Sequence, residues 1–216
     1  MTPDGEGDRV GAKPAWRRLD SAVVHRNPWF EVRQDSVIRP DGELDVYAHV
    51  VAPGSVTVLA IDEAGDVVLT RQWIYTHEST QWRLPGGGVE PFDADPLAAA
   101  RRELAEETGL HAREWEQLGL IHGADSLSNH VDTVFLATGL TTHAPALEQG
   151  EADLTVCRQP FAAVLELVTS GHMPHAGSAH AVLAMAVRRA RRGFPFPGQG
   201  EHGKPVPGKR PDASWW

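Results

Sequence analysis

Short runs of apolar residues, separated by polar turns, fill the first third of the chain. Within each run Val, Ile, Leu, Tyr and Phe predominate, and several runs alternate apolar with polar positions. This texture favours β-strands, because alternate side chains of a strand point to opposite faces of its sheet. The predicted strands of this region cover residues 21–25, 29–38, 44–51, 55–62 and 67–73.

Turn signals set the expected pairing of these runs. Pro40-Asp41-Gly42 is typical of a tight hairpin turn between two strands. The turn at residues 63–66 predicts a second hairpin, in which the buried runs 55–62 and 67–73 pair with each other. Further along, residues 131–140 and 155–160 have the Val, Thr and Phe content of strands.

Three segments have helical signatures. Residues 161–172 and 178–193 are amphipathic, and each ends near a glycine. The third helix follows Asp95 as N-cap and Pro96 as first residue, and Gly109 suits its C-terminal cap. Strands first, one helix in the middle and two at the end predict an α+β protein, an αβα sandwich with a mixed central sheet and a small N-terminal β region.

Composition divides the 216 residues into a body and two tails. Gly, Asp and Pro in residues 1–15 predict a flexible N-terminus, and the Gly- and Pro-rich, basic residues 193–216 predict a tail. One domain is expected over residues 16–192, and residues 16–51 within it form the N-terminal strands.

Charge and cysteine content exclude several classes of function. The net charge is −9, and the first 187 residues hold 13 Lys and Arg against 27 Asp and Glu. Neither nucleic acid nor an anionic membrane is an expected partner of so acidic a body, whereas cations are. Cys157 is the single cysteine, which excludes an intrachain disulfide and a multi-cysteine zinc site. With no secretory signal recognised at the start of the chain, a cytoplasmic location is expected.

The middle helix combines an apolar stripe with an unusual acidic patch. Glu103, Glu106 and Glu107 stand at positions i, i+3 and i+4 and project from one face. Like charges at this spacing cost roughly 0.2–0.5 kcal/mol per pair. A divalent cation such as Mg²⁺ or Mn²⁺ would reverse that cost, because both prefer hard oxygen ligands. The alternative is a solvated acidic face paired with Arg101 and Arg102.

A glycine loop precedes this helix and completes a recognisable motif. Gly86, Gly87 and Gly88 are followed by Glu90-Pro91 and then by Arg102-Glu103-Leu104-x-Glu106-Glu107-x-Gly109-Leu110. This segment resembles the Nudix box, G-x5-E-x7-R-E-U-x-E-E-x-G-U, where U is aliphatic. Residues 27–43, the runs around 58–73, 135–140 and 151–161 are similar to the ADP-ribose pyrophosphatase branch of the Nudix hydrolases, so that the resemblance covers roughly residues 18–192.

The resemblance implies the fold, the chemistry and a set of site residues. It implies hydrolysis of a diphosphate linked to another group, with Mg²⁺ or Mn²⁺ held by Glu103 and Glu107, joined by Glu106 and by a carbonyl of the glycine loop, with Gly87 our choice. Arg102 would orient this cluster. The general base would come from an acidic loop before the last strand, where Glu148, Glu151 and Asp153 are candidates and Glu151 is our first choice.

Three departures from the family pattern bear on the substrate. The box is one residue too long: counting from Gly87, Asp93 replaces the first box glutamate, whereas counting from Gly88 places Ala94 there, and we prefer Gly87. Arg83 stands where ADP-ribose enzymes usually have glutamate, and Ile74 stands where they usually have arginine. Since a guanidinium suits phosphate oxygens, Arg83 is predicted to bind substrate, together with Arg71 and Gly87.

Aromatic and histidine side chains leave alternatives open. Trp29 and Trp82 could stack on a base or a sugar, or belong to the core. His172 and His175 are expected at the surface.

The sequence therefore predicts a Nudix pyrophosphatase that acts on a small nucleoside diphosphate derivative, with ADP-ribose or a nucleotide sugar first. A nucleoside triphosphate hydrolase and a non-hydrolysing nucleotide-binding module are the alternatives. By analogy with the family, the N-terminal strands predict a homodimer.

Overall fold

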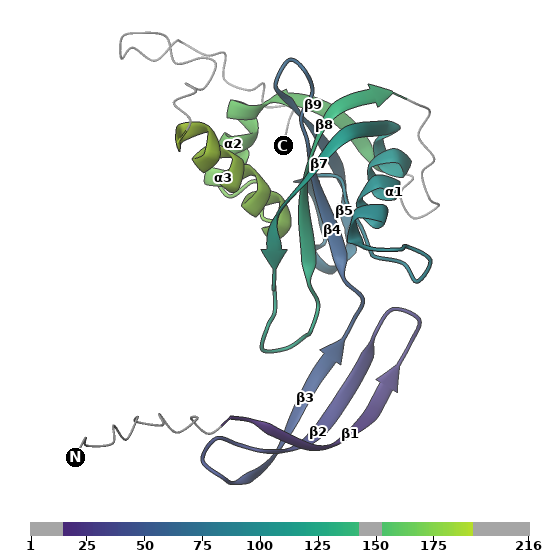
Figure 1. Ribbon diagram of the computed structural model, residues 1–216, viewed down its shortest axis with the longest axis vertical. Helices are drawn as coiled ribbons and strands as arrows, with labels where there is room; N and C mark the ends of the chain where they lie inside the picture. The colour runs from purple at the N-terminus through teal and green to yellow at the C-terminus, as the bar shows by residue number, and fades with distance from the viewer. Residues whose placement is uncertain (1–14, 143–152, 192–216) are drawn as a thin grey trace, which may run out of the picture.

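The computed structural model describes residues 15–142 and 153–191. Its first three strands form an antiparallel sheet that stands apart from the rest of the molecule (Figure 1). The second of these strands lies between the other two, and the turn at residues 39–43 is closed by a hydrogen bond from the Gly42 N–H to the Arg39 carbonyl, as the Pro-Asp-Gly signal predicts. The strands are β1 (Arg17–Arg26), β2 (Glu31–Ile38) and β3 (Leu44–Val51).

The body contains two more three-stranded sheets. In one, β4 (Ser55–Ala60) pairs in parallel with β8 (Asp132–Thr142), which pairs antiparallel with β7 (Leu110–Ile121). In the other, β5 (Asp66–Ile74) lies between β6 (Ser79–Arg83) and β9 (Thr155–Pro160), and all the pairings are antiparallel. A single 3₁₀ turn, Tyr75–His77, connects β5 with β6.

The expected hairpin between residues 55–62 and 67–73 is wrong. The turn is present, with the N–H groups of Ala64 and Asp66 donating to Oδ1 of Asp62, but only one bridge, between Ile61 and Val67, joins the two strands. β4 and β5 instead belong to different sheets, because β4 pairs with β8 whereas β5 pairs with β6 and β9. The turn residues fix a change of direction and leave the pairing to tertiary contacts.

Helices cover both sides of the body, which makes it the expected αβα sandwich (Figure 1). α1 (Pro96–Thr108) lies on one side, and α2 (Phe161–Thr169) and α3 (Ala176–Arg191) lie on the other. The predicted caps of α1 are present: Oδ1 of Asp95 accepts from the Ala98 N–H at 2.8 Å, and Gly109 ends the helix with a positive φ of 67°. α1 is therefore fixed at both ends next to the glycine loop.

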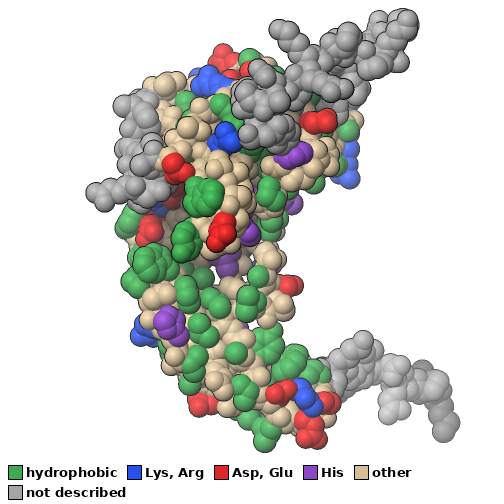
Figure 2. Space-filling view, turned by 180° about the vertical axis from the view of Figure 1, so that it is seen from behind, with side chains coloured by type: hydrophobic (Ala, Val, Ile, Leu, Met, Phe, Trp, Pro, Cys, Tyr) green, Lys and Arg blue, Asp and Glu red, His purple; other side chains and the backbone are tan. Residues whose placement is uncertain are grey.

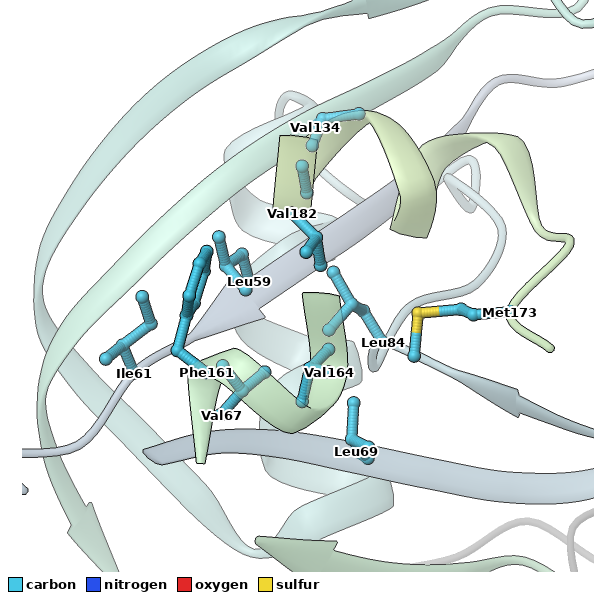
Figure 3. Close-up of a cluster of buried hydrophobic side chains, with 11 residues drawn as sticks. Leu59, Ile61, Val67, Leu69, Leu84, Val134, Phe161, Val164, Met173 and Val182 are labelled. Atoms are coloured by element: carbon cyan, nitrogen blue, oxygen red, sulfur yellow. The ribbon is translucent and has the colours of Figure 1, made fainter. Parts of the chain in front are cut away.

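The strand β4 supplies side chains to two apolar clusters. Val56 and Val58 pack with Leu104 on the α1 side, whereas Leu59 packs with Phe161 and the other side chains drawn in Figure 3, on the side of α2 and α3. A strand buried on both faces needs such near-continuous hydrophobicity. Between Val56 and Val58, Thr57 is a buried polar exception, and it belongs to the site described below.

The N-terminal sheet carries much exposed apolar surface. Every residue of β1 is exposed, and hydrophobic side chains gather on this part of the molecule (Figure 2). Leu44 and Val46 of β3 are 72% and 54% exposed. Exposed apolar surface of this kind often marks a site of interaction with another molecule. Among the described residues, no helix is long and apolar enough to cross a membrane.

Candidate active site

The Arg102 guanidinium is the centre of the predicted box. Nε and Nη2 contact the two carboxylate oxygens of Asp93 at 3.2 and 2.9 Å, and Nη1 donates to Glu103 at 2.8 Å and to Glu106 at 2.9 Å. Nη2 also donates to the Gly88 carbonyl at 2.9 Å. All five donors are used, a geometry that lysine could not reproduce.

This network settles the register of the lengthened box. The residue that contacts Arg102 is Asp93 rather than Ala94, as expected when the box is counted from Gly87. A turn holds it there, since the Asp93 N–H donates to the Glu90 carbonyl and the Glu90 N–H donates back to Oδ2 of Asp93. The hydrogen bond from Arg102 lowers the pKa of Asp93, and the same bond raises the pKa of Arg102. The aspartate that stands at the first glutamate position of the box is therefore paired with Arg102.

Two buried carboxylates face the glycine loop. Glu103 and Glu107 are 7% and 3% exposed. Oε2 of Glu107 accepts from the Gly86 N–H at 2.9 Å, and a Cβ at Gly87 would lie 2.5 Å from Oε1 of Glu103. A side chain at Gly87 would therefore displace the Glu103 carboxylate.

The donor set fits a divalent cation. Mg²⁺ is usually bound through one or two carboxylates, with waters and substrate phosphates as the other ligands. Glu103, Glu107 and the nearby glycine-loop carbonyls provide such oxygens beside a polar cavity. In the described ranges no three His, Cys, Asp or Glu side chains are gathered as a complete metal site. Arg102 forms ion pairs with both Glu103 and Glu106.

A small cavity of about 90 Å³ opens beside these carboxylates. Its wall combines β4, β5, the end of β6, the glycine loop and the residue before α3. The lining residues are Ser55, Val56, Thr57, Thr70, Gln72, Arg83, Leu84, Gly86, Gly87, Glu107 and His175.

Arg83 brings a positive charge to this cavity. Burial lowers the pKa of its guanidinium, which Glu107 and Asp132 counteract electrostatically. In residues 15–142 and 153–191 its guanidinium has no hydrogen-bond or ion-pair partner. Oε1 of Gln72 is also buried in this wall without a hydrogen-bond partner among the described residues. An unmatched cation and an unmatched acceptor indicate a polar ligand.

Asp132 forms a buried polar support behind the cavity. Its two oxygens accept from the hydroxyls of Ser55 at 3.0 Å and of Thr57 at 2.8 Å. Gly177 packs so closely that a Cβ there would lie 2.0 Å from Oδ2 of Asp132. No sequence signal identified this aspartate, because it begins β8 more than seventy residues after its partners.

His175 is half-buried in the cavity wall, whereas a surface position was expected. It lines the cavity, and its Nδ1 accepts from the Ser178 hydroxyl at 2.9 Å, whose oxygen accepts from the Leu84 N–H at 3.0 Å. Burial, and then the charge of Arg83, lower the pKa of His175 to about 4. The imidazole is therefore neutral at physiological pH and serves as a hydrogen-bond acceptor for the start of α3.

Of the remaining predicted residues, Arg71, Trp29 and Asp153 are described by the structure and do not line the cavity. Arg71 lies between Thr70 and Gln72 on β5, so its side chain points to the opposite face of the strand. Its guanidinium lies 5.3 Å from the ring centre of Trp82, which packs on the core. Trp29 is 73% exposed in the β1–β2 turn. Glu148 and Glu151 lie outside the described residues, and Asp153 accepts from the Trp73 N–H at 2.8 Å.

Comparison with known proteins gives the family. The NUDIX domain model matches residues 52–176, and a model described as the nucleoside diphosphate sugar hydrolase N-terminal domain matches residues 16–50. The chain therefore belongs to the Nudix family, and it is a Nudix hydrolase. Members of this family generally need divalent metal ions.

Relatives match along most of their length. An ADP-ribose pyrophosphatase of Mycobacterium tuberculosis is 30% identical over 86% of this chain and 89% of its own length. A CMP-5'-(N-acetyl-N-hydroxy-3-aminopropyl)phosphonate hydrolase of Streptomyces rubellomurinus is 28% identical over 79% and 82%. A solved structure described as an ADP compounds hydrolase superposes with a TM-score of 0.74 at 21% identity, covering 85% of this chain and 98% of its own, which confirms the fold.

The three loop glycines predict three different outcomes for substitution by alanine. Gly86→Ala would place a Cβ 2.1 Å from the Val56 carbonyl oxygen, at a φ of 157°, and is expected to destabilise the fold by about 1–3 kcal/mol. Gly87→Ala meets only the flexible Glu103 carboxylate, so stability changes little while hydrolysis falls. Gly88→Ala, with no atom nearer than 3.9 Å, serves as the control. Urea unfolding and hydrolysis rates measure both effects; equal losses for all three would contradict this assignment.

His175 predicts a pH dependence of stability. Because its pKa falls from 6.5 in the unfolded chain to about 4 in the folded one, the unfolded state binds more protons between these values. Stability is fully present above pH 6.5 and declines as the pH falls towards 4. In urea unfolding at several pH values, His175→Gln should lose less stability over this window than the wild type. The exposed His172, substituted in the same way, is the control, and an identical slope for His175→Gln would refute the prediction.

Proposed function

We propose that this Nudix hydrolase cleaves the diphosphate linkage of a nucleoside diphosphate derivative, with ADP-ribose or a nucleotide sugar as the first candidates. The proposal is carried by the pair of buried carboxylates, Glu103 and Glu107, which lie against the glycine loop beside the Arg83 guanidinium in the wall of the cavity. The printed names of the relatives, which are hydrolases of ADP-ribose or of a CMP-linked phosphonate, support this substrate class.

We assign the metal site to Glu103 and Glu107, with Glu106 and the Gly87 carbonyl in support and with Mg²⁺ or Mn²⁺ as the ion. When bound, such an ion neutralises the diphosphate and lowers the pKa of a coordinated water. Arg102 offsets the charge of the carboxylate set and fixes its geometry. Arg83 provides donors for phosphate oxygens, and His175 and Gln72 complete the polar wall around the bound group.

The general base remains assigned to Glu151. The support for this choice is its place in the sequence, four residues before β9 begins at Thr155, and close to Asp153, which accepts a hydrogen bond from the Trp73 N–H of β5. Because Asp153 is already held by a backbone N–H, it is the weaker candidate for accepting a proton from water.

We also propose a homodimer formed through the N-terminal strands, residues 16–51. The exposed apolar side chains of β1 and β3 support this proposal. Trp29 does not line the catalytic cavity of its own chain. A contact between Trp29 and the substrate would therefore be made across the dimer, in the cavity of the other chain.

Glu107→Gln tests the metal assignment. We expect hydrolysis of ADP-ribose to fall at least about 100-fold, with weaker Mn²⁺ binding by titration, because a neutral amide is a poor ligand for a hard cation. Glu151→Gln should lower kcat with little change in Mn²⁺ affinity. The exposed Glu116 provides the control substitution. Hydrolysis that survives in Glu107→Gln would exclude α1 as the metal-binding element.

Arg83→Ala tests substrate binding. We expect KM for the diphosphate substrate to rise about 10- to 100-fold, since a charge-assisted hydrogen bond contributes about 1.5–3 kcal/mol. Arg83→Lys should recover part of this loss. Arg113→Ala, outside the cavity, is the control. An unchanged KM in Arg83→Ala would show that the guanidinium does not contact the substrate.

Light scattering tests the dimer. The wild type should have twice the mass of the chain, and Leu44→Asp with Val46→Asp should shift the protein towards the monomer, because charge is introduced into a buried apolar interface. Substitution of Asp45, the polar residue between them, should leave the mass unchanged. A monomeric wild type would refute the proposal.

A further inference from the structure

Gln72 of β5 brings an unmatched hydrogen-bond acceptor to the catalytic cavity. Its side-chain oxygen Oε1 is buried and has no hydrogen-bond partner in residues 15–142 and 153–191, although the residue lines the cavity. A buried acceptor without a donor is unfavourable, because it has lost the hydrogen bonds that water would make. A ligand that donates a hydrogen bond to Oε1 would remove this cost.

Strand pairing places Gln72 on the same face of the sheet as Arg83. Thr70 is the register partner of Arg83, and Gln72 follows Thr70 by two residues, so the three side chains share one face. Diagonal neighbours on paired antiparallel strands have Cα atoms about 7–8 Å apart. Since all three residues line the cavity, a cation and an unmatched acceptor lie within the reach of one sugar phosphate.

Two side chains of the wall supply hydrogen-bond donors. The guanidinium of Arg83 can only donate. Nδ1 of His175 accepts from the Ser178 hydroxyl at 2.9 Å, so the neutral imidazole has its proton on Nε2 and donates from that atom. Phosphate oxygens, which accept hydrogen bonds, therefore suit Arg83 and His175, whereas Oε1 of Gln72 needs a group that has a proton.

The size of the cavity limits which part of a substrate enters it. At about 90 Å³ it is smaller than the roughly 300–1,000 Å³ of sites that enclose a whole small ligand. Glu107 belongs to the same wall, so the part that enters lies next to the diphosphate. That part is either a terminal phosphate or the group that is bonded to the second phosphate.

The unmatched acceptor favours a substituted phosphate over a terminal one. A terminal phosphate is mostly ionised above pH 7 and offers only acceptor oxygens, which would repel Oε1 of Gln72. A sugar hydroxyl can donate to the same atom. A site built to bond a hydroxyl discriminates against a ligand that lacks it, because the buried protein group is then left unpaired.

We propose that Gln72 is a specificity-determining residue, whose Oε1 accepts a hydrogen bond from a hydroxyl of the sugar bonded to the diphosphate, while Arg83 contacts the adjacent phosphate. This inference rests on the proposed function and adds a reason for its substrate class. It explains how one cavity wall selects a diphosphate that bears a sugar over a nucleoside di- or triphosphate that ends in phosphate.

Equilibrium dialysis in EDTA tests this role, because no metal-dependent hydrolysis then consumes the ligand. The two probes are ADP-ribose and the β-methyl ester of ADP, which has the same charge but no hydroxyl on its substituent. In Gln72→Leu the preference for ADP-ribose over the methyl ester should fall about 3- to 10-fold, as expected for one neutral hydrogen bond. Gln72→Met, of similar length, gives the same test if Gln72→Leu does not fold.

Matched variants separate this role from a general loss of binding. Arg83→Ala should weaken both probes equally, because both have the phosphate. Gln117→Leu, which alters an exposed glutamine of β7 outside the cavity, should bind both like the wild type. An unchanged preference in the Gln72 variants, an equal loss for both probes, or no binding of ADP-ribose by the wild type would each overturn the proposal.

Hydrolysis with Mg²⁺ distinguishes a failure of this inference from a failure of the proposed function. If Gln72 controls the binding preference but the wild type does not hydrolyse ADP-ribose or a nucleotide sugar, the proposed function is wrong and the recognition of the hydroxyl stands. If hydrolysis occurs and the preference does not depend on Gln72, only the role of Gln72 is refuted.

Discussion

The five hydrogen bonds of the Arg102 guanidinium are the interaction on which the candidate active site depends. Glu103 and Glu107 are nearly buried and lie one turn apart on one helix, an arrangement that would be unfavourable without compensation. Arg102 supplies that compensation for Glu103 and Glu106, and its contacts with Asp93 and the Gly88 carbonyl tie helix, turn and loop into one unit. The cluster is therefore rigid before a metal ion or substrate is present.

The central strand β4 connects this unit to the rest of the cavity. Its N–H groups at Val56 and Val58 bond to the carbonyls of Gly87 and Pro85, so the glycine loop is held as an added edge of β4. Thr57, between them, points to the other side and bonds to Asp132. One strand thus positions the carboxylate side of the site through its backbone and the polar support through a side chain.

The walls of the cavity surround the common catalytic centre of a shared scaffold. Relatives with the same overall fold act, by their names, on ADP-ribose or on a CMP-linked phosphonate. A fold hosts different specificities by changing the residues around a common centre. Here Arg83 and His175 lie together in the wall, with one positively charged and the other kept neutral by burial and by that charge.

The sequence by itself determined the local features, and the tertiary structure decided what depends on contacts between distant segments. The helix 96–108, its caps, its acidic face and the box motif follow from residues close together in the chain, since capping and side-chain spacing act within a few residues. The pairing of β4 with β8 instead of β5 was not predictable from a turn. Nor was the meeting of Thr57, Gln72 and His175 around one cavity, because these residues come from three separate parts of the chain, and only packing brings their side chains together.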